Sequence, residues 1–250
     1  MRFYFLFLQF LLPPYLFANY QVSDTLTKEY KYEYEHNLNL KNTAFPLGLL
    51  TLGFFGIESD GIQFVNKKIR NGVTRSNDKH LNVDDFLRHA PGVAVYVNNL
   101  LGIKGNNNLK NQLLIHATSL LIMSQSVSVL KKETHVKRPD GGSYTSFPSS
   151  HTALAFANAE FLWQEYKDVS IWYGIAGYTL ASSVGVLRIW NDKHWTTDVL
   201  AGAAVGILST KLAYFVHEKV SIKLNKKNKS VVIFPHYNTK QLGLSCSITL

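Results

Sequence analysis

His194 and Asp198 stand four residues apart, a spacing that places two side chains on one face of a helix. A carboxylate bound to one imidazole nitrogen fixes the tautomer and leaves the other nitrogen free to attack an electrophile. An isolated pair of this kind is also compatible with an exposed histidine near a helix N-terminus. A zinc site is a third interpretation, but no His-x-x-x-His pair or ligating cysteine accompanies it, so we expect no metal.

Two basic residues further upstream have the chemistry to hold a phosphate. Lys131 and Arg138 are seven residues apart, or two helical turns, so both project from one face if a helix continues that far. Pro139 then favours an end to that helix. An ammonium and a forked guanidinium together suit a phosphate dianion. The alternative is that both residues only solvate a helix C-terminus and interact with its dipole.

A loop rich in glycine and serine leads into the next expected helix. After Gly141-Gly142-Ser143 the chain runs through Phe147-Pro148-Ser149-Ser150-His151 into an apolar, alanine-containing segment. The N–H groups and the positive dipole end at a helix start receive anions, and the serine hydroxyls add donors. Serine and proline are also ordinary residues at a helix start. His151 is a titratable group beside this natural anion site, which suits acid–base chemistry.

Taken together, the three clusters resemble the three-part signature of the type 2 phosphatidic acid phosphatase (PAP2) family. The matching patterns are Lys131-x6-Arg138-Pro139, Pro148-Ser149-x-His151 and Arg188-x5-His194-x3-Asp198. This family shares its core with class A bacterial acid phosphatases and vanadium-dependent haloperoxidases. The segments 138–141 and 147–151 look most like exported PAP2 proteins of the Bacteroidetes type.

The resemblance implies a role for each matched residue. His194 attacks phosphorus and forms a phosphohistidine, Asp198 orients it, and His151 protonates the leaving alkoxide and later activates water. The groups implied to stabilise the phosphoryl oxygens are Lys131, Arg138, Arg188, Ser149 and the amide of Ser150. Because cationic side chains do what a metal does elsewhere, the resemblance implies no cofactor.

The chain departs from the family pattern at two positions. Ser150 stands where the pattern has glycine, so a Cβ lies where backbone approaches phosphate closely, and affinity or rate should suffer. Leu187 stands where a serine commonly precedes Arg188, which removes a helper donor. The catalytic positions are intact.

These patterns predict a metal-independent phosphatase that hydrolyses phosphomonoesters. The expected substrate is lipid-linked, such as a phosphatidate-type, isoprenyl or lipid A phosphate, with no single one selected. Two alternatives stay open. One is a vanadium-dependent haloperoxidase-like enzyme, and the other is a non-catalytic phosphate- or lipid-binding envelope protein.

The expected fold is all-α, a PAP2-type bundle of about six core helices. We predict a signal peptide at 1–18, a polar extension at 19–43, the helical domain at 44–222, and a linker with a short C-terminal β-hairpin at 223–250. Residues 111–130 and 169–187 contain no charge and are long enough to cross a bilayer. We interpret both stretches as buried helices of the bundle.

The net charge of +9 favours anionic partners, namely phosphate groups or anionic lipid. No basic run, zinc-finger spacing or RNA-reading aromatic motif supports nucleic acid. A short apolar run before Pro13 and a small-residue site at Ala18 predict export to the periplasm. Low hydropathy favours a peripheral protein, although integral attachment and the oligomeric state stay open. Cys246 is the single cysteine, so no internal disulfide forms.

Overall fold

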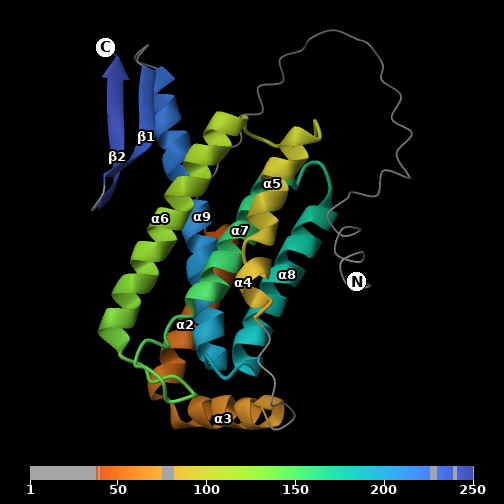
Figure 1. The fold of residues 1–250 in the computed structure, drawn as a ribbon, viewed down its shortest axis with the longest axis vertical. Coiled ribbons are helices and arrows are strands. Elements are labelled where there is room, and N and C mark those ends of the chain that lie inside the picture. The colour runs from red at the N-terminus through yellow and green to blue at the C-terminus, as the bar shows by residue number, and fades with distance from the viewer. Residues whose placement is uncertain (1–37, 39, 75–81, 226–229, 239–240, 250) are drawn as a thin grey trace. The chain divides into compact units, whose positions relative to one another are not determined.

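The computed structural model describes residues 38, 40–74, 82–225, 230–238 and 241–249. In these ranges the helices are α2 (Leu40–Glu58), α3 (Asp60–Thr74), α4 (Asp84–Leu87), α5 (Ala90–Leu100), α6 (Leu109–Thr134), α7 (Ser150–Tyr166), α8 (Ile171–Trp190) and α9 (Thr196–Asn225) (Figure 1). The predicted all-α fold is confirmed. The predicted signal peptide and residues 19–37 of the predicted extension lie outside the described residues. Helix α2 begins inside the end of that extension.

Helix α7 forms the centre of the helical bundle. It packs against α5, α6, α8 and α9, so it has neighbours on every side (Figure 1). Its alanines are fully buried, and they are Ala153, Ala155, Ala157 and Ala159. Such small side chains let neighbouring helices come close to its backbone. The helix starts at Ser150 because the side chain of Ser149 caps it by accepting from the N–H of Thr152.

Helix α9 approaches α7 through two glycines. A Cβ on Gly202 would lie 2.6 Å from the carbonyl oxygen of Ser149, and one on Gly206 would lie 2.2 Å from that of Ala153. Neither position tolerates a side chain at this helix separation. The start of α9 is thereby fixed against the start of α7. These two helix starts carry four of the eight predicted site residues, namely Ser149, Ser150, His151 and Asp198.

Helix α6 ends earlier than the sequence suggested. Its last residue is Thr134, and His135 follows in the left-handed conformation with φ of 47°. Lys131 therefore lies in the last turn of the helix, whereas Arg138 lies in the loop after it. A helix that continues as far as Arg138, the condition for both to project from one helix face, is therefore not present.

The expectation that residues 111–130 form a buried bundle helix is wrong. Helix α6 is long and apolar enough to cross a membrane, yet only 22% of its apolar window is buried. Residues Thr196–Ser221 of α9 also qualify as a span, with 61% of the window buried. Length and composition alone define both candidates. Residues 171–187 of the other uncharged stretch lie in α8, which is not one of them. Gly177 and Ala181 of this helix are buried whereas Ile171 and Trp172 are exposed, so it is buried along one face only.

Two strands follow α9. They are β1 (Ser230–Asn238) and β2 (Gln241–Thr249), and they pair antiparallel with Ile233 opposite Cys246. They lie in the part of the sequence that was predicted to form a hairpin, and none of the predicted site residues belongs to them.

Candidate active site

His194 and Asp198 meet in the interior, at the junction between α8 and α9. Both are almost fully buried, with 3% and 1% of their surface exposed. His194 Nδ1 lies 3.6 Å from Asp198 Oδ2. Because α9 starts at Thr196, His194 precedes the helix rather than sharing a helical face with Asp198. The pair nevertheless forms, and with Nδ1 turned to the carboxylate the other ring nitrogen, Nε2, is the one that can attack.

Ser146 completes the surroundings of this carboxylate. Its hydroxyl donates to Asp198 Oδ2 at 2.5 Å and lies 3.5 Å from His194 Nδ1, and the N–H of Trp195 donates to the same oxygen at 2.9 Å. Two donors besides the imidazole thus hold the carboxylate in place. Sequence reasoning missed Ser146, because a serine in a loop 48 residues before His194 gives no signal by its spacing.

The protein environment keeps the His194 imidazole neutral. Burial lowers its pKa from 6.5 to about 4, the carboxylate of Asp198 opposes this shift, and the cations Lys131 and Arg188 add to it. At neutral pH the ring is therefore a neutral imidazole with a proton on only one of its two nitrogens. A lone pair on Nε2 is what a nucleophilic histidine requires.

Two cationic side chains act on this pair, and Arg138 is close enough to Lys131 to add to the effect of burial in lowering the pKa of that ammonium. Lys131 and Arg188 act on His194 electrostatically, and Lys131 donates a hydrogen bond to the carbonyl oxygen of Thr145. Arg138 and Thr145 both lie in the loop between α6 and α7. In the described part of the chain, the Nε atoms of Arg138 and Arg188 are buried without a hydrogen-bond partner. A buried N–H left without an acceptor is unfavourable, and an oxyanion bound there would satisfy it.

Ser149 and Ser150 begin α7 next to these groups. The Oγ of Ser149 accepts from the hydroxyl of Thr152 at 2.9 Å, so its own hydrogen is available to a further acceptor. The N–H of Ser149 donates to the carbonyl oxygen of Asp198 at 3.0 Å. Ser150 is the first residue of the helix, where backbone N–H groups have no partner within the helix. The two serines therefore lie where the sequence predicted an anion-binding helix start.

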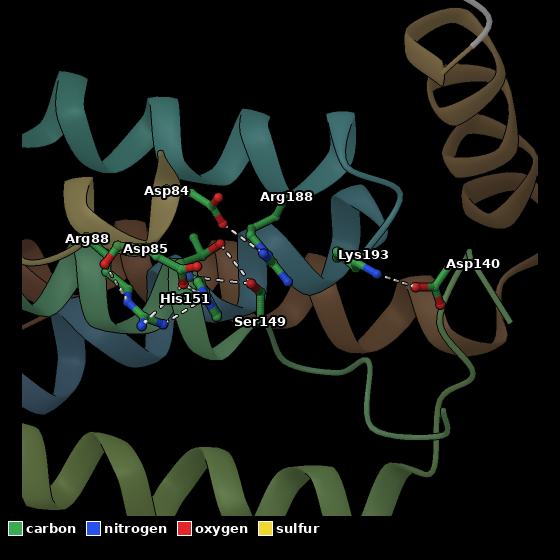
Figure 2. A network of polar contacts seen from close by, with 9 residues as sticks. Asp84, Asp85, Arg88, Asp140, Ser149, His151, Arg188 and Lys193 are labelled. Carbon is green, nitrogen blue, oxygen red and sulfur yellow. Dashed lines mark hydrogen bonds and ion pairs between the residues drawn. The ribbon is translucent and has the colours of Figure 1, made fainter. Parts of the chain in front are cut away.

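His151 faces the short helix α4. Its Nε2 lies 2.9 Å from Asp85 Oδ1 and 2.7 Å from an Nη atom of Arg88 (Figure 2). The neighbouring Asp84 is buried and pairs with Arg188 at 2.7 Å. Sequence reasoning missed Asp85 and Arg88 altogether, because they precede His151 by more than 60 residues and belong to no recognised pattern.

The carboxylates of Asp84 and Asp85 and the ring of His151 bring three ligand atoms within 4.8 Å of one another, a spacing that a metal ion could use. Each carboxylate already faces an arginine, however, since Asp84 pairs with Arg188 and Asp85 lies 3.3 Å from Arg88. Two guanidinium groups at the same place oppose a divalent cation. The ion pairs account for these acidic groups better than a metal does.

Ion pairs also hold the loops that frame the site. Lys193, next to His194, pairs with Asp140 at 2.9 Å and so connects the loop after α8 to the loop after α6 (Figure 2). Arg70 of α3 pairs with Asp192 at 2.6 Å. These contacts limit the movement of the segments that carry Arg138 and His194.

Comparison with known proteins agrees with this geometry. Residues 112–221 match the model of the PAP2 superfamily, a range that contains every predicted site residue. This part of the chain therefore resembles the PAP2 superfamily, as the three clusters predicted.

Two curated proteins are similar to the chain in sequence. The chain is 34% identical to a lipid A 1-phosphatase of Porphyromonas gingivalis over 208 residues, which are 79% of this chain and 45% of that protein. It is 37% identical to the bacitracin transport permease protein BcrC of Bacillus licheniformis over 76 residues, 30% of this chain and 36% of that one. The chain thus spans less than half the length of each of these relatives. The first similarity agrees with the expected Bacteroidetes type.

A solved structure shows the same fold. It is that of the transmembrane PAP2-type phosphatidylglycerolphosphate phosphatase from Bacillus subtilis, with a TM-score of 0.53 and 24% identity. The match covers 73% of this chain and 98% of that chain.

Proposed function

We propose that this protein is a metal-independent phosphatase that works through a phosphohistidine on His194. The observation that carries the proposal is a buried, neutral imidazole paired with Asp198 beneath cationic side chains. Two of these cations, Arg138 and Arg188, have buried N–H groups without an acceptor. A phosphoryl group bound there would supply that acceptor and lie next to Nε2 of His194. The comparisons do not favour a haloperoxidase.

In the first step, Nε2 of His194 attacks phosphorus while the bond from phosphorus to the leaving oxygen breaks. His151 gives its proton to that oxygen, so the alcohol leaves neutral. Asp198 stabilises the positive charge that develops on the phosphorylated imidazole. The guanidinium groups of Arg138 and Arg188, the ammonium of Lys131 and the start of α7 stabilise the equatorial oxygens.

In the second step, water attacks the phosphohistidine. His151, now neutral, takes a proton from that water, and the bond between phosphorus and Nε2 breaks. Inorganic phosphate leaves, and both histidines return to their starting protonation states. The cycle therefore consumes one water and needs no metal.

We further propose that the phosphate is attached to a lipid and that the protein meets it at a membrane surface. Membrane association is supported by the two candidate spans, of which α6 is mostly unburied. Lys131 lies in the last turn of the candidate span in α6, and the candidate span in α9 begins at Thr196. The proposed site therefore lies at one end of each span. The P. gingivalis relative is a lipid A 1-phosphatase, which supports a lipid phosphate as the substrate. Mostly unburied α6 favours integral attachment over the peripheral attachment that low hydropathy suggested.

The predicted export would place this surface on the periplasmic side. Protease protection of the active-site loops in whole cells and in spheroplasts would test the side. Accessibility from the cytoplasmic side only would contradict it.

The activity itself is tested by release of phosphate from the purified, detergent-solubilised protein. The panel should contain phosphatidate, an isoprenyl phosphate, lipid A and a soluble phosphomonoester, each with the His194→Ala variant as control. We expect hydrolysis of at least one lipid phosphate by the wild-type protein and a loss of roughly 10³-fold or more in the variant. An acid quench should trap acid-labile phosphate on His194. Equal activity in His194→Ala would contradict the mechanism.

A further inference from the structure

His151 has two partners of opposite charge at a single ring nitrogen. Nε2 lies 2.9 Å from the carboxylate of Asp85 and 2.7 Å from the guanidinium of Arg88 (Figure 2). A nitrogen that carries a proton can donate to the carboxylate but cannot accept from the guanidinium. A nitrogen without a proton can do only the reverse. The two partners therefore suit two different protonation states of the same ring.

The positions of both partners are fixed by contacts to the bundle. The carbonyl oxygen of Arg88 accepts a hydrogen bond at 2.7 Å from the side chain of Asn158 in α7, the helix that also carries His151. At the other end of α4, Asp84 pairs with Arg188 of α8 at 2.7 Å. Asp85 and Arg88 also lie 3.3 Å apart and restrain each other. The short helix is thus held against the site at both ends.

We propose that Asp85 and Arg88 are positioning residues that stabilise the protonated and the neutral form of His151, respectively. The inference rests on the proposed function, in which His151 is first an acid and then a base. Before the first step the proton on Nε2 is held by Asp85. When the leaving oxygen takes that proton, the freed lone pair accepts an N–H from Arg88. When water returns a proton to Nε2, the contact with Asp85 forms again.

The charges around His151 agree with this division. Burial has the largest effect and lowers its pKa below 6.5, Arg188 of α8 and Arg88 lower it further, and Asp85 and Asp84 of α4 raise it. Arg188 and Asp84 pair with each other, so their opposing effects partly cancel. The contacts of Asp85 and Arg88 with Nε2 remain the ones that change with its protonation.

The decisive experiment compares the pH dependence of kcat/KM in Asp85→Asn and Arg88→Gln. The alkaline limb reports deprotonation of the general acid in the free enzyme. Removing the carboxylate disfavours the imidazolium, so the limb of Asp85→Asn should move to lower pH by about one unit. Removing the guanidinium favours the imidazolium, so the limb of Arg88→Gln should move to higher pH by a similar amount. A purely structural role would lower the rate without opposite shifts.

Two control variants accompany these measurements. Asp85→Glu keeps the charge and should restore most of the wild-type profile. Lys110→Gln removes an exposed charge at the other end of α6, about 30 Å along the helix from Lys131, and should leave the profile unchanged. Limbs that move in the same direction in both test variants, or that do not move, would overturn the inference.

An NMR titration of the His151 ring in the same variants gives its pKa without any turnover. Its resonance is assigned from its loss in His151→Asn. The titration should show the same opposite shifts. If the wild-type protein hydrolyses no phosphoester, the proposed function fails while the titration still tests the two partners. If hydrolysis occurs but the pKa of His151 is insensitive to both variants, the inference alone fails.

Discussion

Replacing Asp198 by asparagine separates the charge of this residue from its shape. The donors from Ser146 and Trp195 and the ring of His194 all meet a single oxygen of the carboxylate, Oδ2. The carbonyl oxygen of an asparagine can take the same place and keep those donors. The tautomer of His194 is then retained, and what disappears is the negative charge that stabilises the phosphorylated, positively charged ring.

We therefore expect Asp198→Asn to lower kcat by roughly 10²–10³-fold, the milder part of the range for catalytic histidines that lose their carboxylate. This corresponds to about 2.7–4.1 kcal/mol in activation free energy. Asp198→Ala removes the acceptor as well and should cost about tenfold more. Ser146→Ala leaves the carboxylate with its other donor and should cost only about tenfold.

The assay is phosphate release under saturating substrate, with thermal unfolding of each variant measured alongside. The quenched phosphohistidine should also decrease in Asp198→Asn, because the intermediate itself is destabilised. If Asp198→Asn stays within threefold of the wild type, or if Ser146→Ala is the more damaging change, our reading of this carboxylate is wrong.

Three further predictions follow from the site and the helix packing. The value of kcat/KM should fall as the pH drops through about 4, where the buried ring of His194 gains a proton. It should also fall on the alkaline side, where His151 loses its proton. An acid limb near pH 6.5 would contradict the lowered pKa of His194. Extensive EDTA treatment should leave phosphate release unchanged, and vanadate should inhibit it. A loss of phosphate release on EDTA treatment that zinc or magnesium restores would instead identify Asp84, Asp85 and His151 as metal ligands. Gly206→Ala should destabilise the protein by about 1–3 kcal/mol in thermal unfolding, because its Cβ would meet the backbone of α7, and Gly48→Ala, which meets nothing within 4 Å, is the matched control.

The sequence predicted the all-α fold and the grouping of the signature residues because both depend on local patterns. Helix boundaries lie close to Lys131, Ser149 and His194, and helix boundaries can be predicted from the types of the neighbouring residues. The assembled site supports that grouping, although the catalytic roles remain a proposal. The end of α6 before Arg138 was not predicted, since the left-handed residue His135 has no compositional signal.

Two features could not be read from the sequence. Asp85 and Arg88 reach His151 only because α4 packs onto the start of α7, and no local spacing encodes a contact between segments so far apart. The exposure of α6 was also missed. An uncharged helix has the same composition whether protein or lipid covers it, so the surroundings of α6 follow only from the packing of the whole bundle.

The hydrogen bond from the N–H of Ser149 to the carbonyl oxygen of Asp198 joins two segments of the proposed active site through main-chain atoms alone. No replacement at position 198 removes that oxygen, and among the standard residues only proline at position 149 removes that N–H. This hydrogen bond is therefore retained in side-chain variants at positions 149 and 198 other than proline at 149. The same bond means that Ser149→Pro, unlike Ser149→Ala, would disturb both halves of the site at once.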